Sequence, residues 1–282
     1  MLMRSLNLLA DQPLVASAKL LSFLLVSYLL FAEVRADEFR LVATHSHIKG
    51  FVGMDALGNY FGIENGEVVR YTSHALTSSY SNHQLGPVSM IDVSDPLNIL
   101  VFFENFGNVV FLDKNLTGKS SIEGFSLYPP HIPSVVCMSS KHSFWAYFPD
   151  AFRFVNFSFR GVQGISSQDL NSNYPQMGQV KFMLENDDKL FIAANGIWVF
   201  DLHANHLFTI GHIHASRFQV KGNKIFYLAE DTLMIYDFFL DQENVFLLPE
   251  KGTKTFFIKN NNTLYLQTND ALKRYVYTGK LY

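Results

Sequence analysis

The 282-residue sequence contains a single cysteine, Cys137, so it can form neither an intrachain disulfide nor a metal site built from several thiolates. It also lacks an excess of charge of either sign, because 22 Lys and Arg residues against 25 Asp and Glu give a formal net charge of −3 at pH 7. A nucleic-acid surface needs a stripe of cationic side chains that neutralise phosphates. We therefore expect no nucleic-acid partner, and we expect packing to stabilise the fold.

Motifs that carry catalytic chemistry are missing as well. The sequence has no Gly-x-Ser-x-Gly elbow, no His-Glu-x-x-His pair and no glycine-rich loop between a strand and a helix. Cys137 lies between Val136 and Met138 in an apolar segment, where a thiol usually acts as a small buried side chain. We expect no cofactor, and a non-enzymatic role is favoured over catalysis.

A hydrophobic run long enough to span a bilayer is also absent. Residues 20–32 are apolar, but this run is only 13 residues long, whereas a membrane-spanning helix needs about 20. Arg4 and Lys19 precede the run, and small residues near Ala36 offer a cleavage site. The pattern predicts a secretory signal peptide over residues 1–36 and a mature domain over residues 37–282, exported to the periplasm or cell envelope, with no membrane span after cleavage. Retention of the run as an anchor is the alternative.

The abundant residues are aromatic: the chain has 27 Phe and 13 Tyr, which suit half-buried strands better than helices. One strand pattern recurs six times with starts 35 to 46 residues apart, close to the length of a four-stranded propeller blade. These landmark strands begin at Asn59, Ile99, Ser143, Lys189, Lys224 and Thr263. The repeat predicts an all-β fold, a six-bladed β-propeller, with five or seven blades as alternatives and a two-sheet sandwich less favoured.

Each landmark strand is followed by a tight turn and by another strand. The following strands are expected at 67–71, 108–112, 152–157, 197–201, 232–236 and 271–276, and the preceding ones at 51–55, 88–93, 134–138, 180–184, 216–220 and 254–258. The last unit ends before a fourth strand, and residues 39–44 form a spare strand near the predicted cleavage site. We expect this N-terminal strand to complete the last blade, since closing the ring removes an open edge. Deletion of residues 38–45 should then destabilise the whole domain.

One segment has a more specific likeness. The sequence Ile-Asp-Val-Ser-Asp-Pro-Leu-Asn-Ile-Leu-Val-Phe-Phe from Ile91, with the segment 106–116 after it, resembles uncharacterised exported β-propeller proteins of Bacteroidota. The likeness covers one blade, and elsewhere the match is to the general blade pattern. It implies the fold and export, and it implies no activity.

Polar residues gather at the predicted blade junctions and turns. Connections between blades and turns between second and third strands lie on one side of a propeller, so this face should be rich in imidazole and carboxylate. Its candidate binding residues are His45, His47, His212, His214, Glu64, Glu104, Asp150, Glu230, Asp231 and Asp270. The two histidine pairs lie at non-adjacent junctions, while a metal needs three or four converging ligands, so no metal site is predicted. Turn geometry by itself also favours Asp, Asn and Gly.

Aromatic side chains are further candidates for partner contacts: Tyr128, the segment 144–147, and the pair Phe238 and Phe239. We expect most of these rings to be buried in the interfaces between blades. We expect a non-enzymatic interaction module that binds another envelope protein. The alternative is a ligand-binding or sugar-binding propeller, or a propeller enzyme, that uses the central funnel.

Overall fold

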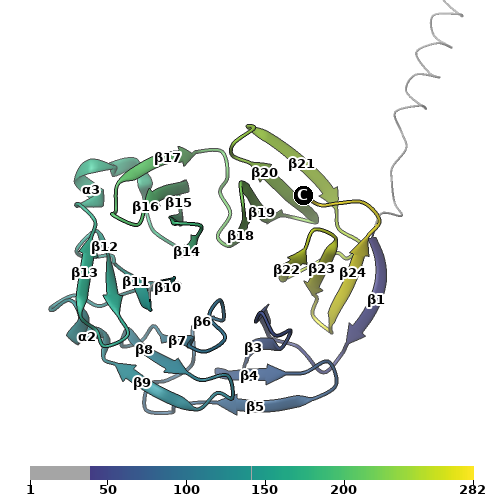
Figure 1. Cartoon of the computed structure of the whole chain (residues 1–282), viewed down its shortest axis with the longest axis horizontal. Helices are drawn as coiled ribbons and strands as arrows, with labels where there is room; N and C mark the ends of the chain where they lie inside the picture. Colours follow the sequence, from purple (N-terminus) through teal and green to yellow (C-terminus); the bar gives the residue numbers. More distant parts are fainter. Residues whose placement is uncertain (1–38, 141) are drawn as a thin grey trace, which may run out of the picture. The chain divides into compact units, whose positions relative to one another are not determined.

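In a computed structural model, residues 39–140 and 142–282 are described. The predicted signal peptide, residues 1–36, lies outside the described residues. Residues Phe39–Tyr282 form one compact unit in which six four-stranded antiparallel sheets are arranged as the blades of a propeller (Figure 1). The predicted six-bladed fold is confirmed.

The strands follow one another from the centre of the ring outward in each blade. Blade 1 consists of β2 (Phe51–Met54), β3 (Tyr60–Glu64), β4 (Glu67–Tyr71) and β5 (Leu76–Tyr80). Blade 2 consists of β6 (Met90–Asp92), β7 (Ile99–Phe103), β8 (Asn108–Leu112) and β9 (Gly118–Ile122). Blade 3 consists of β10 (Val135–Ser139), β11 (Ser143–Phe148), β12 (Arg153–Ser158) and β13 (Gln163–Ser166).

Blades 4 to 6 repeat this order. Blade 4 consists of β14 (Phe182–Asn186), β15 (Lys189–Ala194), β16 (Gly196–Asp201) and β17 (His206–Ile210). Blade 5 consists of β18 (Phe218–Lys221), β19 (Lys224–Ala229), β20 (Thr232–Asp237) and β21 (Gln242–Leu247). Blade 6 consists of β22 (Thr255–Asn260), β23 (Thr263–Gln267), β24 (Leu272–Tyr277) and β1 (Phe39–His45). The helices are short, α2 (Gly124–Leu127), α3 (Leu170–Asn173) and the 3-10 turn η1 (Pro175–Met177). No helix in the described part of the chain is long and apolar enough to cross a membrane.

Ring closure takes the predicted form. Strand β1 pairs antiparallel with β24, with Phe39 opposite Tyr277 and His45 opposite Leu272. It is therefore the outer strand of the last blade, and Figure 1 shows the first described strand beside the last. This pairing joins the two ends of the described chain through backbone hydrogen bonds and covers the outer edge of β24.

Six buried hydrophobic clusters hold the ring, one between each pair of neighbouring blades. Aromatic rings meet across these interfaces: Phe111 and Phe144 lie 5.6 Å apart between blades 2 and 3, and Phe154 and Phe200 lie 4.9 Å apart between blades 3 and 4. Both pairs are edge-on, an arrangement that aromatic rings prefer. The abundance of Phe and Tyr is thus explained by the blade interfaces.

The expected innermost strands begin too early in five blades, by one residue in blades 3 and 6 and by two residues in blades 2, 4 and 5. Strands β6, β14 and β18 begin at Met90, Phe182 and Phe218, two residues later than predicted. In blade 2 the reason is visible, because the backbone N–H of Val88 donates to the carbonyl oxygen of Gly66 in blade 1 at 2.9 Å. Val88 therefore joins neighbouring blades before its own strand starts.

Candidate functional site

The predicted polar rim contains contacts between blade junctions and turns. Glu64, at the end of β3, accepts hydrogen bonds at Oε1 from the backbone N–H groups of Lys49 and Gly50, at 3.1 and 3.3 Å. Asp231 accepts one from the backbone N–H of Gly252 at 3.1 Å, and Asp150 pairs with His131 at 2.8 Å. These three carboxylates bind the chain's own connections, so part of the rim is structural.

The histidine pair of blade 6 lies in an aromatic cluster. The rings of His45 and His47 are 5.9 Å apart, and they contact Tyr60 and Tyr71 at 5.3 and 5.6 Å. Nδ1 of His45 lies 3.2 Å from the carbonyl oxygen of Ser73, and burial lowers the pKa of His45 below its ordinary value. The hydroxyl of Tyr71 donates to Glu64 at 2.7 Å. The structure therefore brings His45, His47 and Glu64 into one neighbourhood.

The second histidine pair lies at the junction between blades 4 and 5. The ring of His212 packs edge-on against Tyr236 at 4.9 Å, while His214 is exposed. Three other predicted residues, Glu104, Glu230 and Asp270, are exposed in their turns. In residues 39–140 and 142–282, no three His, Cys, Asp or Glu side chains come together as a set that could hold a metal ion.

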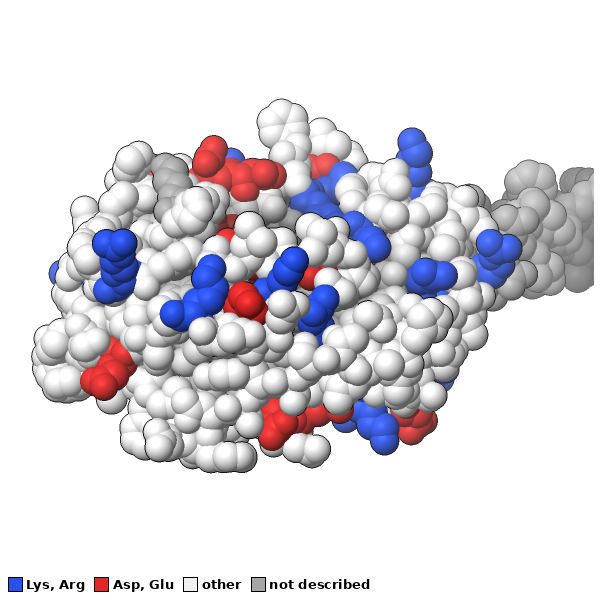
Figure 2. Space-filling view, turned by 60° about the horizontal axis from the view of Figure 1, so that its bottom comes forward, with Lys and Arg blue, Asp and Glu red and all other residues white. Residues whose placement is uncertain are grey.

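Figure 2 shows charged side chains of both signs scattered over one face of the molecule, with uncharged residues between them. This distribution agrees with the small net charge of the whole sequence. The face shown offers no continuous cationic stripe of the kind that tracks a phosphate backbone.

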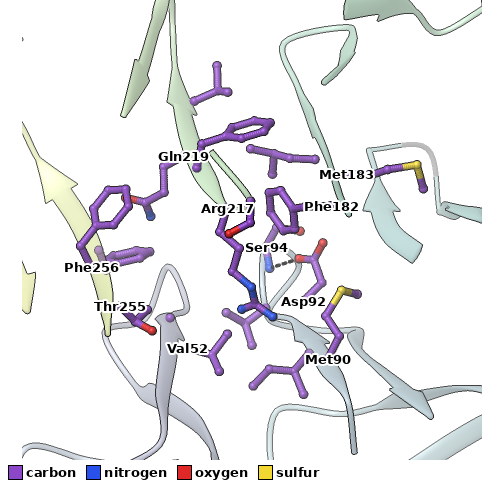
Figure 3. Close-up of a pocket in the computed structure, with 18 of the residues that line it drawn as sticks. Val52, Met90, Asp92, Ser94, Phe182, Met183, Arg217, Gln219, Thr255 and Phe256 are labelled. Atoms are coloured by element: carbon purple, nitrogen blue, oxygen red, sulfur yellow. Dashed lines mark hydrogen bonds between the residues drawn. The ribbon is translucent and has the colours of Figure 1, made fainter. Parts of the chain in front are cut away.

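The axis of the ring contains a cavity of about 390 Å³ that the sequence did not identify (Figure 3). All six innermost strands contribute to its wall, which is largely apolar and includes Val52, Met90, Val136, Phe182 and Phe256. Its charged residues are Asp92, Arg217, Lys221 and Lys254. No histidine, glutamate or cysteine appears among the described residues that line it.

Two polar side chains in this wall connect neighbouring blades. Asp92 of β6 accepts hydrogen bonds from the backbone N–H of Ser94 and, across the blade interface, from that of Met138, both at 3.0 Å. Gln219 of β18 accepts one from the backbone N–H of Ile258 in β22 at 2.8 Å. These bonds satisfy inner-strand backbone groups that would otherwise face an apolar space.

Arg217 lies directly before β18 and, unlike Asp92 and Gln219, does not connect neighbouring blades. Figure 3 shows its side chain extending into the cavity between Asp92, Val52 and Thr255. Within the described part of the chain its guanidinium has neither a hydrogen-bond partner nor an ion-pair partner, and burial lowers the pKa of Arg217. A single arginine before an apolar strand was the only signal in the sequence, and it does not reveal that the residue faces the axis.

The aromatic candidates separate into buried and exposed residues. Phe144, Trp145 and Tyr147 are buried in blade interfaces, and Tyr128 and Phe238 are half-buried. Phe239 is 77% exposed, and its neighbour Leu240 is 56% exposed. The expectation that most of these rings are buried is confirmed, and Phe239 is the exception.

No known family profile matches the chain, and no curated protein sequence matches it either. Among solved structures, virginiamycin B lyase from Staphylococcus aureus is similar with a TM-score of 0.55 and 13% identity, over 79% of this chain and 78% of that one. The WD40 domain of Neurospora crassa Pan2 is similar with a TM-score of 0.56 and 11% identity, over 83% and 76%.

A third similar structure is PorZ of Porphyromonas gingivalis, described as an essential bacterial surface component of the type-IX secretion system. The match has a TM-score of 0.52 and 13% identity, and it covers 86% of this chain but only 33% of PorZ. Similarity at these levels of identity shows the fold alone. This chain therefore has the fold of β-propeller proteins.

Proposed function

We propose that this chain is an exported, non-enzymatic β-propeller that binds another protein of the cell envelope through an apolar tip on blade 5. The tip consists of Phe239 and Leu240, which lie in the turn between β20 and β21. The observation that carries the proposal is that these two large apolar side chains are held exposed on a turn that is itself firmly fixed.

Asp237 holds the turn through hydrogen bonds to its backbone. It is only 5% exposed, and its Oδ1 accepts hydrogen bonds from the backbone N–H groups of Phe239 and Leu240, both at 3.0 Å. Its other oxygen pairs with Nζ of Lys224 at 2.5 Å. Burial by itself would raise the pKa of Asp237, but the hydrogen bonds from Lys224 and the two backbone groups outweigh it, so the pKa lies below its ordinary value.

Contacts of the residues next to the tip also stabilise the turn. The hydroxyl of Tyr236 donates to Asp241 at 2.6 Å, and the ring of Phe238 packs 5.5 Å from that of Phe208 in blade 4. A contact surface that is already ordered loses little conformational entropy when a partner binds. Exposed aromatic side chains on such a surface are typical anchors of protein interfaces.

Blade 5 has more exposed apolar surface along β21, the strand that follows the tip. Val245 and Leu247 point to the same side of β21 and are 59% and 67% exposed. Grouped exposed apolar residues are a mark of interaction sites. The predicted polar rim is a weaker candidate because Glu64, Asp150 and Asp231 already contact their own chain.

Export and envelope location are supported by the sequence pattern of residues 4–36 and by the resemblance of residues 91–116 to exported propellers of Bacteroidota. The similarity to PorZ, a bacterial surface component, agrees with this location. The non-enzymatic role rests on the missing catalytic motifs and on the apolar wall of the axial cavity.

Affinity purification from the envelope fraction of the source cells tests the proposal. The tagged chain, its Phe239→Asp variant and a Leu57→Asp control would be compared, since Leu57 is 68% exposed in a turn of blade 1. We expect one protein to co-purify with the unchanged chain and with Leu57→Asp, and to be lost with Phe239→Asp. Equal recovery with all three chains, or no co-purifying protein at all, would overturn the proposal.

A further inference from the structure

The axial cavity contains a cation, Arg217, whose charge is balanced by no partner among residues 39–140 and 142–282. Asp92 is the only carboxylate among its described lining residues, and both of its oxygens accept hydrogen bonds from backbone N–H groups. Asp92 forms no ion pair with Arg217. The guanidinium of Arg217 therefore lies in the cavity, exposed to solvent and without an acceptor among the described residues.

The other charges of the wall do not compensate for Arg217. Lys221 donates from Nζ to the carbonyl oxygen of Lys259 at 2.9 Å, and Lys254 adds another positive charge. The residues that line the cavity thus include three cations and one carboxylate. A cleft with walls of low polarity and one sign of charge concentrates ions of the opposite sign.

The volume and the lining of the cavity indicate which class of anion could bind in it. A volume of about 390 Å³ lies within the range of small-molecule pockets, and it is far larger than an inorganic anion needs. Figure 3 shows Phe182, Phe256, Met90 and Val52 around the arginine, so most of the wall suits an apolar group.

We propose that this cavity binds a small organic carboxylate, with the carboxylate on Arg217 and an apolar body against Phe182, Phe256 and Met90. A planar guanidinium can donate two parallel hydrogen bonds to a carboxylate. The pairing is stronger here than in water because the surrounding wall is apolar. This site is independent of the blade 5 tip, so either proposal can fail without the other.

The direct test is calorimetric titration of the full chain with 3-phenylpropionate, 3-phenylpropionamide and inorganic phosphate. The amide has the same phenylethyl group as the carboxylate but no charge, and phosphate is an anion that lacks this apolar group. We expect the carboxylate to bind at least about 10-fold more tightly than either, because charge-assisted hydrogen bonds contribute about 1.5 to 3 kcal/mol and 1.4 kcal/mol is a factor of ten. Equal affinities for the carboxylate and the amide, or binding of phosphate alone, would overturn the proposal.

Two variants assign the effect to Arg217. Arg217→Gln should abolish the preference for the carboxylate, while Lys114→Gln, which removes an exposed lysine from a turn of blade 2, should leave it unchanged. Without ligand, Arg217→Gln should leave the thermal unfolding midpoint nearly unchanged, since the side chain of Arg217 is exposed to solvent and makes no polar contact with the described residues. A variant that unfolds at or above the normal midpoint and still prefers the carboxylate would contradict the assignment.

Discussion

Phe39, the first residue of β1, lies opposite Tyr277, the last residue of β24, and their rings are 5.1 Å apart. Both rings also contact Phe246 of β21, at 6.4 and 5.4 Å, so the closing strand packs against blade 5 as well. The two ends of the described chain are thereby joined by backbone pairing and by an aromatic cluster between two blades.

Deletion of residues 38–45 should lower the stability of the whole propeller. It removes β1, uncovers the edge of β24 and takes Phe39 from its cluster, and loss of a packed Phe side chain typically costs about 3 to 5 kcal/mol. Urea unfolding followed by tryptophan fluorescence measures the change, with Arg40→Ala as a mild control on the same strand. An unchanged unfolding midpoint would show that β1 does not close the ring.

Asp237→Ala should destabilise blade 5 by about 3 kcal/mol, since it leaves the backbone N–H groups of Phe239 and Leu240 and the ammonium of Lys224 without their acceptor. The variant should also weaken partner binding, because the tip loses its fixed shape. Chemical denaturation and co-purification measure the two effects. Glu123→Ala, which removes an exposed carboxylate with no capping hydrogen bond, should change neither.

Glu250 should make the propeller sensitive to acid. Burial by itself would raise its pKa, but hydrogen bonds from Lys273, at 2.8 Å, and from Tyr275 outweigh it and lower the pKa below the ordinary 4.5. The unfolded chain therefore binds the proton more tightly, so the stabilisation is present above pH 4.5 and is lost as pH falls below that value.

The same contact predicts a loss of stability in alkali. Burial and the hydrogen bond to Glu250 raise the pKa of Tyr275 above its ordinary 10, so this stabilisation is complete below pH 10 and decreases above it. In Glu250→Gln, both pH dependences of the unfolding free energy should weaken. A variant whose acid and alkaline profiles match those of the unchanged chain would disprove this origin.

Cys137 should be unreactive in the folded protein. Its side chain is 1% exposed in the interface between blades 3 and 4, and burial raises the pKa of the thiol well above its usual range. Since the thiolate is the reactive form, a disulfide reagent at pH 7.5 should modify Cys137 only after urea is added. Rapid modification without urea would mean that this interface opens readily.

The sequence was sufficient to predict the blades because each one repeats the same local pattern. Of the strands that follow the turns, β4 and β8 begin and end at the expected residues, and the other four differ from their expected bounds by one residue. Closure by β1 was predictable for a related reason, since a missing outer strand and a spare N-terminal strand leave one simple solution.

The candidate sites were harder to predict because they depend on which residues meet across the ring. Asp92, Arg217 and Gln219 belong to two separate inner segments, and their shared position on the axis follows only from the curvature of the whole ring. Likewise, Trp145 and Phe239 are both aromatic residues in strand-rich segments, but one is 1% exposed and the other 77%. Packing between blades decides this difference.

The most direct test of the proposed interaction is site-specific photocrosslinking in the source cells. A photoreactive phenylalanine derivative would replace Phe239 in the blade 5 tip or, as a control, Leu57 in blade 1. We expect the probe at position 239 to form a crosslink to one envelope protein and the probe at position 57 to form none. Absence of a crosslink at position 239, or the same crosslinks from both positions, would contradict the proposal that blade 5 presents a binding surface.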